Sequence, residues 1–139
     1  RYVENAVAWC DDIVAKCTAK VIDRLGLAPD DFEIELRLIG RDATLGPLET
    51  RHGEAAELGV LGIVTAATQA RAAEIGKLLN PYLLHHPLTQ EEEQPTFAFP
   101  FSPAEIDRGA IYEFCLNHVL TLDDPMAAFT LETREVAFA

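Results

Sequence analysis

Histidines are the residues of this chain best suited to acid–base chemistry at neutral pH. His85 and His86 are adjacent, and His118 lies further along the sequence. An imidazole changes its charge near neutrality, so it can take up and return a proton as a general base. Adjacent side chains diverge on regular structure, so only the fold could bring His85 or His86 to His118. The alternative is a set of ordinary hydrogen-bonded histidines, with His52 in a loop.

A charged pair in the string GRDATLG is the best candidate for holding a substrate. Arg41 and Asp42 directly follow Gly40, where a strand is expected to end. Such a pair can bind a carboxylate or orient a loop. The alternative is a surface ion pair that fixes a turn, worth about 0–1 kcal/mol. On the enzyme hypothesis, Arg41 holds a substrate carboxylate and a histidine is the base, with Gln69 or Asn117 in the same concavity.

Other kinds of site lack their usual sequence signals. The histidines show no HxH or HExxH spacing and no CxxC pair occurs, so we expect no metal. The glycines form neither GxGxxG nor a P-loop, so we expect no cofactor. The single serine, Ser102, lies in FSP, outside any GxSxG elbow, and is expected to cap a helix.

The three cysteines are interpreted as core residues. Cys10 and Cys17 lie two helical turns apart on one apolar face, and Cys115 falls in an apolar strand candidate. A buried free cysteine behaves as a small hydrophobic residue. An odd number of cysteines without a CxxC pair fits a reducing, cytoplasmic compartment.

Composition excludes two classes of partner. The chain has 139 residues, 49% of them hydrophobic, and a formal net charge of −12. This hydrophobic content is ordinary for a globular domain. Nucleic acid is not expected as a partner, because phosphate binding depends on lysine and arginine. A membrane is not expected either, because the most apolar stretch, residues 58–67, is about half the length that a bilayer needs.

Periodicity predicts four elements in the first two-thirds of the chain. Apolar residues recur every 3.6 positions from Val3 to Leu25, which predicts a helix ended by Gly26. Residues 32–39 alternate as a half-buried strand, and 41–57 form a long loop. Residues 58–65 are apolar enough for a central strand buried on both faces. Thr68 caps a second helix, which we expect to break at Asn80-Pro81 before a short run that ends at Pro87.

The last third predicts two more strands. Residues 97–101 are extended, 102–105 form a short helical turn, and 110–121 are a strong strand candidate. A turn at 123–125 precedes one helical turn at 126–129, and a short strand follows toward residue 139. The order α-β-β-α-β-β in one domain, residues 1–139, predicts an α+β two-layer sandwich, ferredoxin-like or permuted ferredoxin-like, with helices on one face of a mainly antiparallel sheet. A strand upstream of Arg1 would restore the usual ferredoxin-like order.

Five strings together resemble the C-terminal part of the acyclic terpene utilisation (AtuA-like) family. They are GRDATLG, AATQARAAEIGKLL, LLHHP, TFAFPFSPAEID and IYEFCLNHV, and they occur in the order of the family pattern. The positions that match are Gly40-Arg41-Asp42, Thr68-Gln69, Leu83-Leu84-His85, Ala98 to Pro103, and Ile111 to Phe114 with His118. The resemblance implies a cytoplasmic bacterial protein of several hundred residues that takes part in the breakdown of acyclic terpenes and other acyl compounds.

This resemblance sets the expected function and its alternatives. The chain would be the C-terminal domain of an AtuA-like protein and would contribute to a substrate cleft, with His85, His86 and His118 as catalytic candidates. Its partner would be the missing N-terminal domain of the parent chain. The first alternative is a structural or oligomerisation domain that packs against further copies, and the second is a small-ligand binding module.

Overall fold

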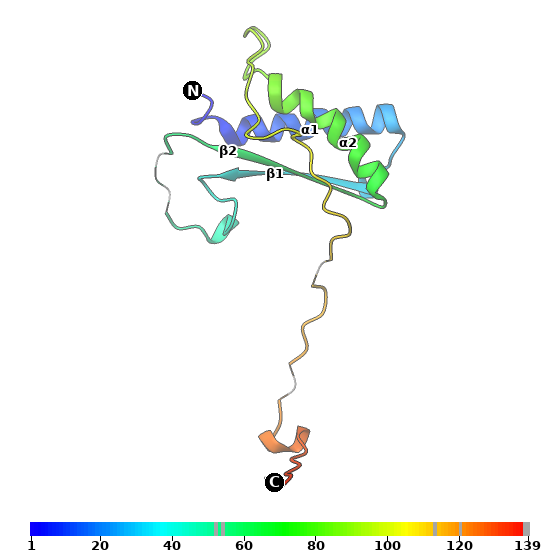
Figure 1. Ribbon diagram of the computed structural model, residues 1–139. Coiled ribbons are helices and arrows are strands. Elements are labelled where there is room, and N and C mark those ends of the chain that lie inside the picture. The colour runs from blue at the N-terminus through cyan, green and yellow to red at the C-terminus, as the bar shows by residue number, and fades with distance from the viewer. Residues whose placement is uncertain (52, 54, 113, 120, 138–139) are drawn as a thin grey trace.

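The computed structural model describes residues 1–51, 53, 55–112, 114–119 and 121–137, so His52, which was expected in a loop, lies outside the described residues. Two long helices and two strands form its body (Figure 1). Helix α1 spans Ala6–Leu25, strand β1 Phe32–Ile39, strand β2 Gly59–Ala66 and helix α2 Gln69–His85. Short 3-10 helices occupy Pro29–Asp31, Gly46–Leu48 and Pro125–Ala128. The predicted order α-β-β-α is confirmed for this body.

The two strands pair antiparallel, and both helices cover the same face of the sheet. The register runs from Phe32 opposite Ala66 to Ile39 opposite Gly59. Figure 1 shows α1 and α2 side by side on one side of the strands. The protein is therefore a two-layer α+β fold. The expectation that β2 is buried on both faces is wrong: Leu61, on the face without helices, is 45% exposed, because no second layer covers that face in the described residues.

The core lies between the helices and the sheet. Helix α1 buries Cys10, Ile13, Cys17 and Val21, as its 3.6-residue period predicts, and it buries Ala6 and Trp9 as well. The helix ends at Gly26, whose φ of 64° is the left-handed conformation that glycine adopts without strain. The interpretation of Cys10 and Cys17 as core residues is confirmed.

Helix α2 begins as predicted and ends later than predicted. The Thr68 hydroxyl accepts a hydrogen bond of 3.3 Å from the Arg71 backbone N–H, which confirms the cap. The helix continues through Pro81 to His85, so the expected break at Asn80-Pro81 is wrong. Pro81 costs the helix one backbone hydrogen bond. Tyr82 and Leu83 then pack against the core, and this packing offsets that loss.

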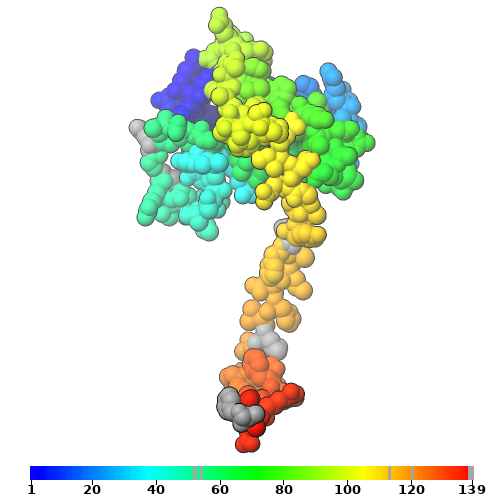
Figure 2. All heavy atoms as spheres, in the orientation of Figure 1, coloured from blue at the N-terminus to red at the C-terminus, as the bar shows by residue number. Residues whose placement is uncertain are grey.

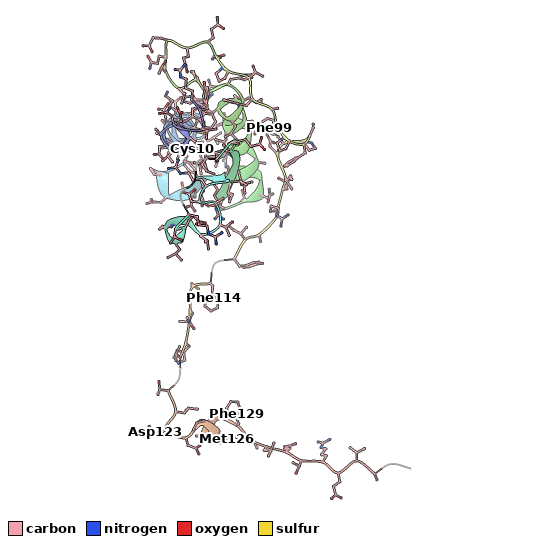
Figure 3. The ribbon with its side chains drawn as sticks, turned by 90° about the vertical axis from the view of Figure 1, so that its left-hand side faces the viewer. Cys10, Phe99, Phe114, Asp123, Met126 and Phe129 are labelled. Carbon is pink, nitrogen blue, oxygen red and sulfur yellow. The ribbon has the colours of Figure 1, made fainter. Side chains whose placement is uncertain are left out.

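The chain after α2 first returns along the body and then leaves it. Phe97 packs on the core, and its backbone N–H donates to the Leu84 carbonyl at 3.0 Å. We call residues 108–137 the C-terminal segment. Figure 2 shows it projecting from the body, and Figure 3 places Phe114, Asp123, Met126 and Phe129 along the projecting part.

Several predictions for this region are wrong. In the parts of 110–121 and of the stretch after Phe129 that the structure describes, no residue belongs to a strand, because no neighbouring strand pairs with them. Residues 102–105 contain bends and no helical turn, so Ser102 caps no helix. Cys115 is exposed and does not lie in the core. The helical turn after Asp124 is confirmed, since the Asp124 carboxylate accepts a 2.9 Å hydrogen bond from the Met126 N–H.

Within the described residues, no helix is both long enough and apolar enough to cross a bilayer.

Candidate functional site

The most developed polar contact of the body joins the two helices at His86. The His86 ring nitrogen Nε2 lies 2.6 Å from Oδ2 of Asp12, and Nζ of Lys16 lies 2.7 Å from the same oxygen. The hydrogen bonds from Lys16 and from His86 hold the pKa of the Asp12 carboxyl below its ordinary value. A carboxylate that fixes one nitrogen of an imidazole is the arrangement that orients a histidine base.

Burial limits what this pair can do chemically. His86 is only 7% exposed, and the rings of Trp9 and Tyr82 lie 6.3 and 5.8 Å from it, centroid to centroid. Its carbonyl oxygen also accepts a 2.8 Å hydrogen bond from the indole N–H of Trp9. A general base needs a substrate within hydrogen-bond reach, and these neighbours leave His86 little open surface. The main role of these contacts is therefore to hold α1 against α2. We call the contacts of His86 with Asp12 and Trp9 the latch.

His85 faces a different part of the molecule. Its ring nitrogen Nδ1 lies 3.0 Å from the Pro95 carbonyl oxygen, in the stretch that follows the helix. The two neighbouring imidazoles therefore have separate partners, as adjacency on a helix requires.

Arg41 and Asp42 lie in the turn after β1, where their backbone N–H groups both donate to the Leu38 carbonyl, at 3.1 and 3.3 Å. A hollow of about 600 Å³, open to solvent, lies beside this turn. The residues that line it include Arg37, Arg41, Asp42, Glu49 and Arg51. The geometry can attract a small anion at the surface, although both signs of charge line the hollow.

The remaining candidates lie elsewhere. Gln69 begins α2, and its amide Nε2 donates a 2.9 Å hydrogen bond to Asp107. Sixteen residues of helix separate it from His85, about 24 Å at a rise of ~1.5 Å per residue. Asn117 and His118 belong to the projecting segment between Phe114 and Asp123 (Figure 3). The structure does not gather the seven candidate residues into one concavity, and their catalytic and binding roles stay predictions.

The described residues of the body offer little basis for a metal site or for a reactive thiol. Among the described residues, no three His, Cys, Asp or Glu side chains are grouped to hold a metal ion. Burial raises the pKa of the Cys10 and Cys17 thiols to about 11. Thiols with such pKa values hold almost no thiolate at neutral pH, so neither is a ready nucleophile.

Two features of the molecule lay outside the sequence-based predictions. The Asp12–His86 contact joins residues 74 positions apart, so no local spacing indicates it. The second is the exposure of the apolar C-terminal segment, where strands of the sheet were expected. Among the largest exposed apolar side chains are Tyr112, Phe114, Leu116, Val119, Phe129 and Leu131.

Comparison of the chain with models of protein families found no match. Comparisons with curated proteins and with solved structures also found none.

Proposed function

We propose that this chain is an oligomerisation domain, whose two-layer body holds copies of the chain together through the C-terminal segment. The observation that carries this proposal is the exposure of large apolar side chains along that segment. Tyr112 is 93% exposed and Phe114 is 82% exposed. Burying one such side chain in a contact stabilises that contact by about 1.5–3 kcal/mol. Exposed apolar surface of this kind marks interaction sites.

The distribution of the candidate catalytic residues supports the same choice. Among the described residues, the contact at His86 joins α1 to the end of α2, the hollow beside Arg41 lies at the turn after β1, and His118 belongs to the projecting segment. Catalysis requires a base, a binding group and a reacting atom within about one hydrogen-bond length of one another. An oligomerisation domain requires only a stable body and a surface to be covered, and the described residues supply both.

A ferredoxin-like arrangement, in its permuted form, is proposed for the assembled protein. The body supplies two helices and two antiparallel strands in the order that this arrangement needs. A strand formed by the C-terminal segment would extend the sheet beyond two strands, and isolated two-stranded sheets are marginal without such additions.

A second candidate function follows from where the AtuA-like strings lie. AATQARAAEIGKLL, LLHHP and TFAFPFSPAEID fall on α2 and on the stretch that returns beside it, which the Asn80–Glu105 and Gln69–Asp107 hydrogen bonds join. The proposal is that this surface forms one wall of a substrate cleft in an AtuA-like protein of terpene or acyl-compound catabolism. The coding sequence upstream of Arg1 tests it: a large domain supports the proposal, and a start codon at that point contradicts it.

Analytical ultracentrifugation of the full chain over a wide range of concentrations tests the oligomerisation proposal. We expect a reversible oligomer, with monomer appearing only on dilution. A single monomeric species at every concentration would overturn the proposal.

A further inference from the structure

The two outer edges of the sheet differ in how they are protected. On the face without helices, β1 carries Glu33, Glu35 and Arg37, whereas β2 has no charged residue and no proline anywhere between Gly59 and Ala66. Edge strands that stay exposed are normally protected by charges, proline or bulges, because their free N–H and C=O groups recruit other strands. The composition of β1 fits an exposed edge, and that of β2 fits an edge meant to be paired.

The structure leaves the β2 edge unpaired. Within the described residues, β2 forms strand hydrogen bonds only with β1. The same strand presents Leu61 and Ile63 on the face without helices, opposite Arg37 and Glu35 of β1. A strand added beside β2 would pair its backbone groups and cover these apolar side chains.

The C-terminal segment contains a stretch suited to that position. Residues 110–121 read AIYEFCLNHVLT, with no glycine or proline and many aromatic and aliphatic residues. Tyr112, Phe114 and Leu116 share one face when this stretch is extended. The stretch is long enough to follow the eight residues of β2 from end to end.

The position of the segment indicates a partner in another molecule. The side-chain bond from Gln69 to Asp107 ties the chain to the first residue of α2, and all described residues of 110–119 are exposed beyond that point. The segment then leads away from its own body (Figure 1), and none of its described residues pairs with β2. When two copies exchange their segments, each segment fills the β2 edge of the other copy. The two contacts are then related by a two-fold axis, the commonest symmetry of homo-oligomers.

The area available fits a stable dimer. Aromatic side chains bury about 150–250 Å² each, and each copy contributes Tyr112 and Phe114 together with several aliphatic residues. Two exchanged segments can therefore reach the ~1,200–2,000 Å² that specific interfaces bury.

Resting on the proposed oligomerisation function, we infer that residues 110–121 of one copy add as a third strand to the free β2 edge of a second copy, and that the second copy returns the same contact. The occupant of the β2 edge is thus a second copy of this chain.

Paired variants of the full chain test this inference by ultracentrifugation. Phe114→Asp with Leu116→Asp places two charges inside the exchanged stretch and is expected to weaken dimerisation at least tenfold. The matched control, Phe101→Asp with Leu48→Asp, makes the same change at two exposed positions outside the C-terminal segment and should dimerise like the parent chain. Equal weakening by both pairs, or by neither, would overturn the strand exchange.

A second pair of variants tests the β2 edge, which receives the exchanged strand in this proposal. Ile63→Lys with Thr65→Lys places charges on β2 opposite Glu35 and Glu33, so the body keeps favourable cross-strand pairs. We expect this variant to be monomeric, while the control Glu33→Gln with Glu35→Gln, which changes the net charge equally on β1, remains dimeric. Far-UV circular dichroism checks that each variant folds.

Hydrogen exchange on the unaltered chain gives a second readout that does not depend on any variant. Amides of 110–121 and of β2 should gain protection together as the dimer forms. A dimer without this gain overturns the strand exchange and leaves the oligomerisation function standing. A monomer at all concentrations, whether or not 110–121 is protected, overturns both.

Discussion

The indole N–H of Trp9, near the start of α1, donates a 2.8 Å hydrogen bond to the carbonyl oxygen of His86, just past the end of α2. The imidazole of His86 reaches back to Asp12, one turn further along α1. Backbone and side chain of one residue therefore join the two helices, and Phe97 completes the contact with its ring 5.6 Å from that of Trp9.

Replacing this indole tests the stability of the latch. Trp9→Phe keeps an aromatic ring but leaves the His86 carbonyl without its donor. We expect the free energy of unfolding to fall by about 1–3 kcal/mol, the usual cost of a buried group left unpaired. Urea denaturation followed by far-UV circular dichroism measures it, because Trp9 is the only tryptophan and its fluorescence is lost in the variant. An exposed aromatic change, Phe129→Leu, should stay within about 0.5 kcal/mol of the parent.

Replacing glycine by alanine is expected to change stability in opposite directions at two positions. A Cβ at Gly62 in β2 would lie 3.1 Å from Cδ2 of Leu79 and 3.4 Å from Cδ2 of Leu36, so Gly62→Ala should cost about 1–3 kcal/mol. A Cβ at Gly76 in α2 would meet nothing within 4 Å, so Gly76→Ala should stabilise the helix by about 0.5–1 kcal/mol. Thermal unfolding of the two variants compares them directly. A stabilised Gly62→Ala would show that α2 does not pack this closely on β2.

The hydrogen bonds that Asp12 accepts from Lys16 and His86 predict a dependence of stability on pH. Its pKa is lowered in the folded protein from an ordinary value of 3.8, so the stability it contributes is fully present above that pH. The contribution is lost as the pH falls through the lower folded-state pKa, where the carboxyl takes up its proton.

The variant Asp12→Asn should therefore be less stable than the parent near neutrality and converge with it in strong acid. Because Asp12 is about half exposed, the difference should be within the ~0.2–1 kcal/mol typical of exposed ion pairs. Urea unfolding at a series of pH values measures it, with Asp11→Asn as a control of equal charge. A difference between parent and Asp12→Asn that does not change with pH would contradict the pKa shift.

The buried thiols predict a pattern of chemical reactivity. In a Cys115→Ser variant, only Cys10 and Cys17 remain, and burial raises the pKa of both to about 11. We expect almost no reaction with a thiol reagent at neutral pH in the folded protein and rapid reaction of both in urea. Fast labelling without denaturant would mean that α1 separates readily from the sheet.

Local signals allowed the body to be predicted from sequence. The helical period ending at Gly26, the alternation of residues 32–39 and the cap at Thr68 each act over a few residues, and all three are confirmed. Pro81 shows where local rules are insufficient. A proline disfavours helix at its own position, yet packing of the following turn on the core decides the outcome.

Contacts between distant parts of the chain could not be predicted in this way. The strand pattern of 110–121 is clear in the sequence, but a strand forms only beside another strand, and the pattern does not say which. Likewise, the partner of His86 is Asp12, which the sequence offers only as one of 23 acidic residues. The pairing depends on how α1 and α2 cross.

The core lies between Tyr2 and Phe97, so all of its apolar residues precede the C-terminal segment in the chain. Ribosomes add about 5–20 residues per second, and small bodies with local contacts fold faster than that. The body, with its open and uncharged β2 edge, can therefore fold as soon as residues 1–97 have left the ribosome, while residues 110–121 are still inside the exit tunnel. On the proposed strand exchange, this edge is then available to the 110–121 stretch of another copy before its own segment is free.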